Sequence, residues 1–297
     1  MELPVVNHKD YVAKIGDDHK FPINKFGELA KYLIDQKIVN KFYNPIACSF
    51  DTLNRAHSED YINDIKNKTL DKNKIKKIGF PLVDSVVQRS LVATGGTVLA
   101  SKLALNYGVA CNTAGGSHHA NYNEGAGYCV FNDVAVAAHY LLDRGYANRI
   151  LIVDLDVHQG NGNSEIFKDN SNVFTFSMHS KTNYPAKKSI SDLDVELKDD
   201  LEDDEYLDTL KYYVNELNDE SFDFIFYIAG VDIHFNDRLG KLKISDEGIR
   251  KRDEIIIENF SSKKIPICGV LGGGYNKDFN KLIELHSFLH QSCAKLL

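Results

Sequence analysis

Side chains with metal-binding chemistry recur at every second position of residues 154–158, whose sequence is DLDVH. An extended chain places successive side chains on opposite sides, so Asp154, Asp156 and His158 share one side. Two carboxylates and an imidazole are costly to bury unless they are hydrogen-bonded or bind a cation. Catalytic zinc takes three protein ligands and leaves one position open for water. Asp156 and His158 supply two such ligands, and Asp232, just beyond apolar residues 222–229, is the best candidate for the third.

Two further groups with acid–base chemistry follow glycine-rich segments. His118 and His119 come directly after Gly115-Gly116-Ser117. An imidazole titrates near neutral pH, so it suits proton transfer to and from water. Tyr275 follows a run of three glycines centred on Gly273, which lets the backbone approach a ligand closely. A phenol in that place can donate to a developing oxyanion.

Each motif by itself has a simpler interpretation. Strand-end aspartates often cap the following helix, and a pair of histidines can be hydrogen-bonded loop residues. The combination of the DLDVH segment, a distant aspartate and a histidine pair favours a metal-dependent hydrolase instead. The sequence therefore predicts hydrolytic chemistry at one pocket.

The elements that position these motifs predict one α/β domain over residues 1–297. Apolar runs rich in β-branched residues predict strands at 108–111, 149–155, 173–177, 222–229 and 266–271. Helical periodicity predicts helices at 24–39, 82–106, 132–144, 203–218, 245–260 and 278–296. Continuous apolar strands alternating with helices indicate a central, mostly parallel sheet with helices on both faces. The motifs follow the strands, so the active site should lie at the C-terminal ends of the strands.

The composition of the sequence excludes some classes of binding partner. A net charge of −7 argues against direct nucleic-acid binding, which needs a basic face. Neither a membrane span nor a secretory signal is visible in the sequence, and five cysteines without CxxC spacing are typical of reduced thiols. We therefore expect an intracellular protein, cytoplasmic or, in a eukaryote, nuclear. The acidic residues 191–208 are interpreted as a solvated loop and helix start, or else as a field that attracts cationic substrates.

Six segments in order resemble the zinc-dependent histone deacetylase superfamily, which has the arginase–deacetylase fold, and its bacterial acetylpolyamine and acetoin-utilisation relatives. They are GGSHHA (115–120), GAGYCVFNDVAVAA (125–138), DLDVHQGNG (154–162), SMHS (177–180), AGVDIHFNDRLG (229–240) and LGGGYN (271–276). Residues 79–97 and the compact length resemble the class IV branch and bacterial histone deacetylase-like amidohydrolases.

The resemblance implies a role for each site residue. The ligands of one Zn²⁺ would be Asp156, His158 and Asp232. His119 would be the general base, with Asn161 as its orienting partner, and His118 would be an electrostatic neighbour oriented by Asp154. Tyr275 would polarise the amide carbonyl and stabilise the oxyanion. Asn161 stands where some classes have an aspartate, so His119 should be less basic here.

The resemblance also implies a substrate tunnel and a second ion. Gly127, Tyr128 and Tyr184 match positions that line an acyl-lysine tunnel, and Gly273 belongs to the same substrate-binding set. Asp154 and Ser177 match a structural monovalent-cation site, usually K⁺.

Three functions remain open from the sequence. The first is deacylation of an acylated amine, either acyl-lysine in a protein or a small molecule such as an acetylpolyamine. The second is an arginase-like ureohydrolase with two manganese ions, which needs more bridging carboxylates than the segment with Asn161 provides. The third is a non-catalytic binder, against which the full set of ligands, histidines and Tyr275 argues. The oligomeric state is not indicated.

Overall fold

Seven parallel strands form the central sheet of the computed structural model, in which residues 2–297 are described. The strands are β1 (Val5–Val6), β2 (Val109–Asn112), β3 (Ile150–Asp154), β4 (Val173–Ser180), β5 (Leu193–Leu197), β6 (Phe224–Ile228) and β7 (Ile267–Val270). Their order across the sheet is β1-β2-β7-β6-β3-β4-β5. The four central strands are buried along their whole length, which explains their continuous apolar sequences.

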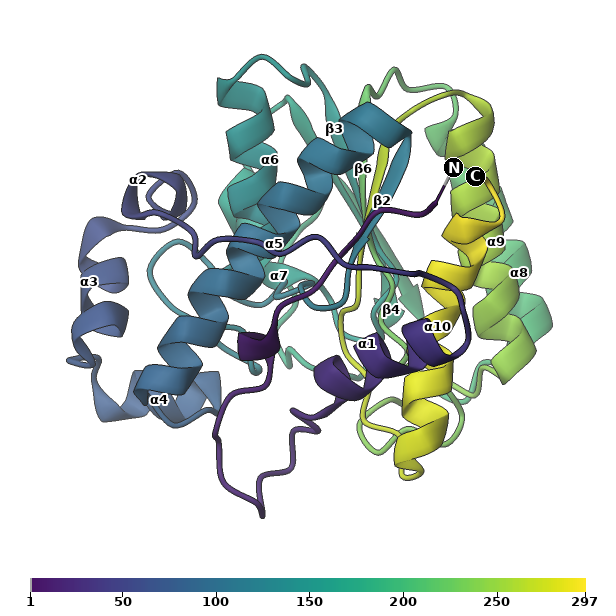
Figure 1. Cartoon of the computed structure of the whole chain (residues 1–297). Coiled ribbons are helices and arrows are strands. Elements are labelled where there is room, and N and C mark those ends of the chain that lie inside the picture. Colours follow the sequence, from purple (N-terminus) through teal and green to yellow (C-terminus); the bar gives the residue numbers. More distant parts are fainter. Residues whose placement is uncertain (1) are drawn as a thin grey trace.

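Helices cover both faces of this sheet (Figure 1). They are η1 (Lys9–Tyr11), α1 (Lys25–Asp35), α2 (Phe50–Leu53), α3 (Glu59–Asn67), α4 (Lys72–Ile78), α5 (Asp84–Tyr107), α6 (Asp133–Asp143), α7 (Asn161–Phe167), α8 (Asp203–Leu217), α9 (Asp246–Ser262) and α10 (Phe279–Ala294). Helices α5, α6 and α7 pack on one face, and α1, α8, α9 and α10 on the other. The predicted single α/β domain is confirmed, and its sheet is parallel throughout.

The chain reverses its direction of travel across the sheet beside β3. After β3 it adds β4 and β5 on one side, and then it returns to add β6 on the other side of β3. The register confirms both neighbours, because Asp154 pairs with Ser177 of β4 and with Ile228 of β6. Loops that leave such neighbouring strands diverge, and the crevice between them is the usual ligand site of an open α/β sheet.

Helix α5 matches the helix predicted at 82–106 and explains its two glycines. A Cβ on Gly95 would lie 2.0 Å from the carbonyl oxygen of Ile46, and one on Gly96 would lie 2.0 Å from the hydroxyl of Tyr11. Both glycines therefore let the N-terminal segments pack directly against the helix backbone. No helix over residues 2–297 is long and apolar enough to cross a membrane.

The acidic segment is only partly the loop and helix start that its composition indicated. Residues Leu193–Leu197 form the edge strand β5, with buried side chains at Val195 and Leu197. Acidic side chains in the segment have structural partners: Asp194 accepts from the Gln159 amide at 2.8 Å, and Asp203 accepts from the backbone N–H of Ser245 at 2.8 Å. The alternation LDVEL is that of a half-buried strand, which the density of charge concealed.

Candidate metal centre and active site

The candidate metal ligands converge where two neighbouring strands end. Asp156 and His158 follow β3, and Asp232 follows β6. The ligand atoms of these three buried side chains lie within 4.8 Å of one another. Nδ1 of His158 is 3.0 Å from Oδ1 of Asp156 and 3.1 Å from Oδ2 of Asp232. The structure thus brings together the three side chains that the sequence assigned to one site.

Backbone donors from neighbouring loops orient both carboxylates. The N–H of Gly273, in the loop after β7, donates to Oδ2 of Asp156 at 2.6 Å. The N–H of Val157 donates to Oδ1 of Asp232 at 2.9 Å. A Cβ on Gly273 would lie 2.0 Å from Oδ2 of Asp232, so a side chain there would displace the carboxylate. Glycine is therefore required for this close approach.

A buried arginine ties the two strand ends together from behind. Arg252 of α9 is fully buried and forms an ion pair with Asp253 at 2.8 Å. Its guanidinium donates to the carbonyl oxygens of Ala229 and Gly230 after β6. It also donates to the carbonyl oxygen of Leu155 after β3, at 3.5 Å. Arg252 therefore holds the backbone that carries all three candidate ligands.

The chemistry of the ligand set fits a divalent cation. Burial and the carboxylate of Asp156 raise the pKa of Asp232 to about 7. Burial lowers the pKa of His158, but its two carboxylate neighbours outweigh burial and raise this pKa to about 10. The two buried carboxylates thus repel each other, and a bound cation would compensate their negative charge. Two oxygens and one imidazole nitrogen are ligands that zinc accepts, with room left for water.

The two histidines after β2 have opposite electrostatic environments. His118 donates from Nδ1 to Oδ2 of Asp154 at 2.6 Å, and its Nε2 is 3.2 Å from Nε2 of His119. Burial lowers the pKa of His118, but the carboxylates of Asp154 and Asp156 outweigh burial and raise it to about 9. Burial and the charges on the neighbouring histidines lower the pKa of His119 well below its ordinary value. His119 is therefore a neutral imidazole, which can accept a proton.

Asn161 determines which nitrogen of His119 is free. Nδ1 of His119 lies 2.7 Å from Oδ1 of Asn161, the first residue of α7. An amide oxygen only accepts hydrogen bonds, so Nδ1 carries the hydrogen and Nε2 is the basic nitrogen, which also accepts from Nε2 of charged His118 at 3.2 Å. The amide supplies no negative charge, in agreement with the low basicity of His119.

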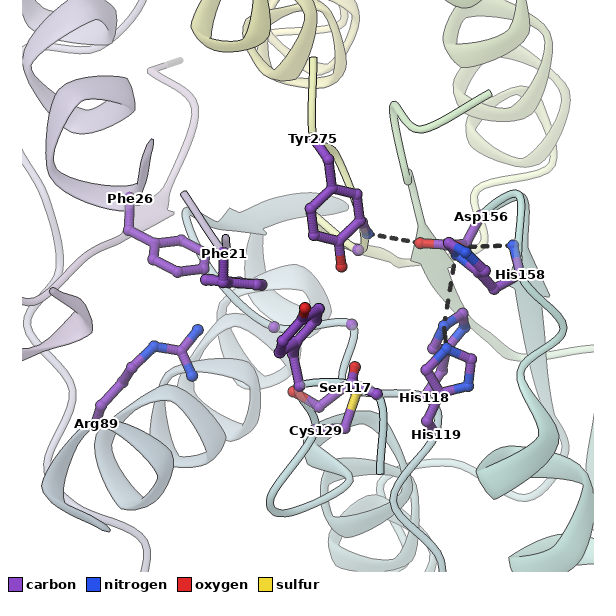
Figure 2. Close-up of a pocket in the computed structure, with 16 residues that line it drawn as sticks. Phe21, Phe26, Arg89, Ser117, His118, His119, Cys129, Asp156, His158 and Tyr275 are labelled. Carbon is purple, nitrogen blue, oxygen red and sulfur yellow. Dashed lines mark hydrogen bonds and ion pairs between the residues drawn. The ribbon is translucent and has the colours of Figure 1, made fainter. Parts of the chain in front are cut away.

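Tyr275 is held over the same cavity by its backbone. Its N–H donates to Oδ2 of Asp237 at 2.7 Å, and its carbonyl oxygen accepts from Nε of Arg238 at 2.9 Å. Its hydroxyl points into the pocket in Figure 2. Burial and the carboxylates of Asp232 and Asp156 raise the pKa of Tyr275 well above its ordinary value. The phenol is therefore protonated and available as a hydrogen-bond donor.

Three of the predicted substrate-binding residues, Gly127, Tyr128 and Gly273, line this cavity, and Tyr184 contacts His119 beside it. Gly127 has a φ of +54°, and a Cβ on it would lie 2.5 Å from Cδ2 of His119. Tyr128 lines the cavity, and its N–H donates to the carbonyl oxygen of Ile78 at 2.7 Å. Tyr184 is half-buried, and its ring lies edge-on to His119 with the ring centres 4.8 Å apart. Gly273 lines the cavity as well.

The predicted monovalent-cation residues, Asp154 and Ser177, are neighbours in the register of β3 and β4. Both are buried, and Oγ of Ser177 is 3.0 Å from Nδ1 of His179. Oδ1 of Asp154 accepts from the N–H of Asp156 at 3.2 Å, which places the pair directly behind the candidate metal ligands.

A pocket joins these groups to an aromatic inner end (Figure 2). Its polar end contains His118, His119 and the candidate metal ligands Asp156 and His158. A set of ligands for a Lewis-acidic ion, a neutral imidazole and a protonated phenol face the same space. Together they suit the addition of water to a polarised carbonyl group.

The comparisons with known proteins agree with this chemistry. The model of the histone deacetylase domain matches residues 19–287. The chain belongs to the histone deacetylase family. It is 33% identical to histone deacetylase 2 of Arabidopsis thaliana over 280 residues, which cover 89% of this chain and 72% of that protein.

Two other comparisons extend over nearly the whole chain. An uncharacterised protein of Picosynechococcus sp. is 43% identical over 295 residues, 98% of each chain. The crystal structure of an HDAC homologue from Aquifex aeolicus has a TM-score of 0.84 at 25% identity and covers 99% of this chain and 84% of that one. The predicted family and fold are confirmed, and the family makes the chain a deacetylase-type hydrolase.

Sequence reasoning missed the residues at the inner end of this deacetylase cavity. Phe21, Phe26 and Arg89 line it, and Lys25 lies beside it with Nζ 3.4 Å from the carbonyl oxygens of Gly272 and Gly274. The sequence contains a signal for the burial of Lys25 and Arg89, because each stands at a helix position whose neighbours on the same face are apolar. Lys25 precedes Leu29 and Leu33 at helical spacing, and Arg89 lies between Val86 and Ala93.

Proposed function

We propose that the protein is a zinc-dependent deacylase that hydrolyses the amide of an acylated amine. The convergence of Asp156, His158 and Asp232 beside a neutral His119 and a protonated Tyr275 carries this proposal. The substrate is acyl-lysine in a protein or, alternatively, a small acylated amine such as an acetylpolyamine. Water and the amide give a free amine and a carboxylate.

Asp156, His158 and Asp232 would hold the zinc. Bound there, zinc would lower the pKa of water towards neutrality and polarise the scissile carbonyl. His119 accepts a proton from the attacking water at Nε2, because its Nδ1–H is engaged by Asn161. The same nitrogen then donates this proton to the leaving amine. Charged His118, held by Asp154, adds positive potential to the active site.

Tyr275 supplies the second stabilising group. Its phenol donates a hydrogen bond to the oxyanion, and its fixed backbone limits the reorganisation that this requires. Gly127, Tyr128 and Tyr184 would flank the aliphatic stem of the substrate, because flat rings pack on a methylene chain while its polar end reaches the cavity. The half-exposed Tyr184 would form the mouth of this tunnel.

Three further assignments belong to this proposal. The assignment of the chain to the class IV branch rests on residues 79–97, which include Arg89. A K⁺ ion would bind beside Asp154 and Ser177, where carboxylate and hydroxyl oxygens suit a hard cation. An intracellular location is supported by five unpaired cysteines, which are typical of reducing compartments.

A substrate panel tests the proposed activity. Zinc-reconstituted protein should be assayed with acetyl- to myristoyl-lysine peptides and with acetylpolyamines. Turnover of any member that disappears on chelation and returns with zinc supports the proposal. Absence of turnover for every member, with zinc bound stoichiometrically, would contradict it. The relative kcat/KM values for peptides and polyamines distinguish the two substrate classes.

A further inference from the structure

The short segment 184–188 holds Tyr184 beside the general-base candidate with little support from its backbone. The Tyr184 side chain is 42% exposed, and its ring centre lies 4.8 Å from that of His119. Within residues 2–297, no backbone–backbone hydrogen bond joins residues 184–188 to another part of the chain. An exposed segment with few hydrogen bonds opens easily, so other contacts must keep the ring of Tyr184 in place.

Buried amide side chains fix the two ends of this segment. Asn183 donates to and accepts from backbone groups of residues 239–241, at 2.7 Å and 3.1 Å. The side chain of Gln159 accepts from the N–H of Ser189 at 2.8 Å and donates to the carbonyl oxygen of the same residue at 2.9 Å. Residues 184–188 therefore form a short loop between two fixed points.

Lys188 bridges this loop with its ammonium group. Nζ donates to the carbonyl oxygen of Asn183 and to that of Pro185, the latter at 3.1 Å. Within residues 2–297 these are the only hydrogen bonds that residues 184–188 form. The two acceptors flank Tyr184 in the chain, so one side chain closes a ring around that residue. A hydrogen bond with a charged donor is about twice as strong as a neutral one, so the ammonium restrains the loop effectively.

We propose that Lys188 is a positioning residue for the reaction. It holds Tyr184 against His119, so that the tyrosine ring forms a fixed wall for the substrate. The inference rests on the proposed function, in which this ring packs on the aliphatic stem of an acylated amine. A wall that is ordered before the substrate arrives reduces the entropy lost on binding. Loss of the Lys188 contacts should therefore raise KM rather than lower kcat.

Steady-state kinetics of Lys188→Met test this role. With the best substrate of the acyl panel, KM should rise about tenfold, because hydrogen bonds from a charged donor are lost, while kcat changes little. Lys188→Arg should bring KM back towards the wild-type value, since a guanidinium can also donate to two carbonyl oxygens. Lys187→Met is the matched control, because the neighbouring Lys187 is exposed.

Two outcomes of these kinetics would contradict the proposal. One is a KM for Lys188→Met that equals that of Lys187→Met. The other is a lower free energy of unfolding in urea with an unchanged KM, which would assign Lys188 a purely structural role.

A double-mutant cycle shows whether Lys188 acts through Tyr184. Tyr184→Ala removes the ring, so adding Lys188→Met to it should have little further effect on kcat/KM. Residues that act through one another are not additive. Effects of the two substitutions that multiply in the double variant would show that Lys188 does not act through this ring.

Fluorescence measures the position of the ring without turnover. The sequence contains no tryptophan, so Tyr184→Trp introduces a single reporter beside the cavity. Adding Lys188→Met to this variant should increase quenching by acrylamide and lower the fluorescence anisotropy, because the loop moves more freely. Unchanged quenching and anisotropy would overturn the proposal. A fluorescence change that depends on Lys188, without turnover of any acyl substrate, would refute the proposed activity alone and support the restraint of Tyr184 by Lys188.

Discussion

Two buried arginines lie near the cavity and are held in opposite ways. Arg252, behind the candidate metal ligands, pairs with Asp253 and donates to backbone carbonyls at the ends of two strands. Arg89, at the inner end, has one backbone acceptor and aromatic neighbours. Burial lowers the pKa of Arg252, but Asp253 outweighs burial and raises it, whereas burial lowers the pKa of Arg89.

The difference distinguishes a cation whose hydrogen-bond donors are all engaged from one whose donors are partly free. A guanidinium whose donors are all engaged fixes the geometry around it, so the metal end is rigid. A guanidinium with free donors gains most when a ligand supplies the missing anion. The cavity therefore combines an end whose buried cation is fully engaged with an inner end whose buried cation keeps free donors.

The largest expected effect comes from removing a ligand at the rigid end. Asp156→Ala should lose zinc and turnover together. Even hydrogen-bond partners of metal ligands contribute about 10- to 100-fold in metal affinity, so loss of a ligand should exceed that range. Elemental analysis and the deacylase assay measure both effects. Asp192→Ala is the control, since this carboxylate accepts from Thr175 in the sheet at 2.7 Å and should not affect zinc. Stoichiometric zinc in Asp156→Ala would remove Asp156 from the ligand set.

Replacing the two arginines should lower the stability of the protein by different amounts. Arg252→Met leaves the Asp253 carboxylate buried without its partner, so the free energy of unfolding should fall by about 3–5 kcal/mol. Arg89→Met leaves no buried anion unpaired. The free energy of unfolding should therefore fall by only about 1–2 kcal/mol, from the loss of one hydrogen bond and the ring contacts. Urea denaturation of both variants gives the values. Equal losses would show that the contrast between the two cations is mistaken.

Tyr275→Phe tests the catalytic end without disturbing its metal. The variant should bind zinc normally, while kcat falls by about 10²–10³, the usual cost of one oxyanion donor. Single-turnover kinetics with zinc analysis separate these effects. Tyr212→Phe, which changes an exposed tyrosine, should match the wild type. Retention of full activity by Tyr275→Phe would assign oxyanion stabilisation to another group.

Lys25 should give the smallest effect, through the pH dependence of stability. Burial lowers its pKa from 10.5 to about 8. Below pH 8, Lys25 is protonated in both the folded and the unfolded state, so the folded state bears the full cost of burying its charge. Between these values the unfolded state binds more protons, so wild-type stability should rise with pH relative to Lys25→Met, by at most on the order of 3 kcal/mol.

Denaturation at pH 7.5 and at pH 10 measures this difference for the wild type and Lys25→Met. Lys102→Met, at an exposed position of α5, is the control and should show no such rise. A difference between wild type and Lys25→Met that is independent of pH would show that Lys25 titrates normally.

The catalytic end was largely predictable because its signals are local. Alternation in an extended segment put Asp156 and His158 on one side, and parallel strands bring their C-terminal ends to one edge of the sheet. The order of the strands was not predictable. Only pairing across the sheet made β3 and β6 neighbours and brought Asp232 to Asp156.

The inner end was not predicted, since its residues meet only through long-range packing. Helical spacing with apolar neighbours could have indicated that Lys25 and Arg89 are buried, but it does not reveal that they lie at the same cavity. The edge strand β5 was missed for a related reason, because Asp194 in it and Asp192 before it have their partners, Gln159 and Thr175, far away in the chain.

The sequence by itself determined the types and local spacing of the catalytic groups, because backbone geometry alone sets which neighbours share a side. Tertiary structure decided the distances between groups from different strands, the charge states of the two histidines and the unpaired state of Arg89. These properties depend on burial and on partners far away in the chain, which no local pattern records.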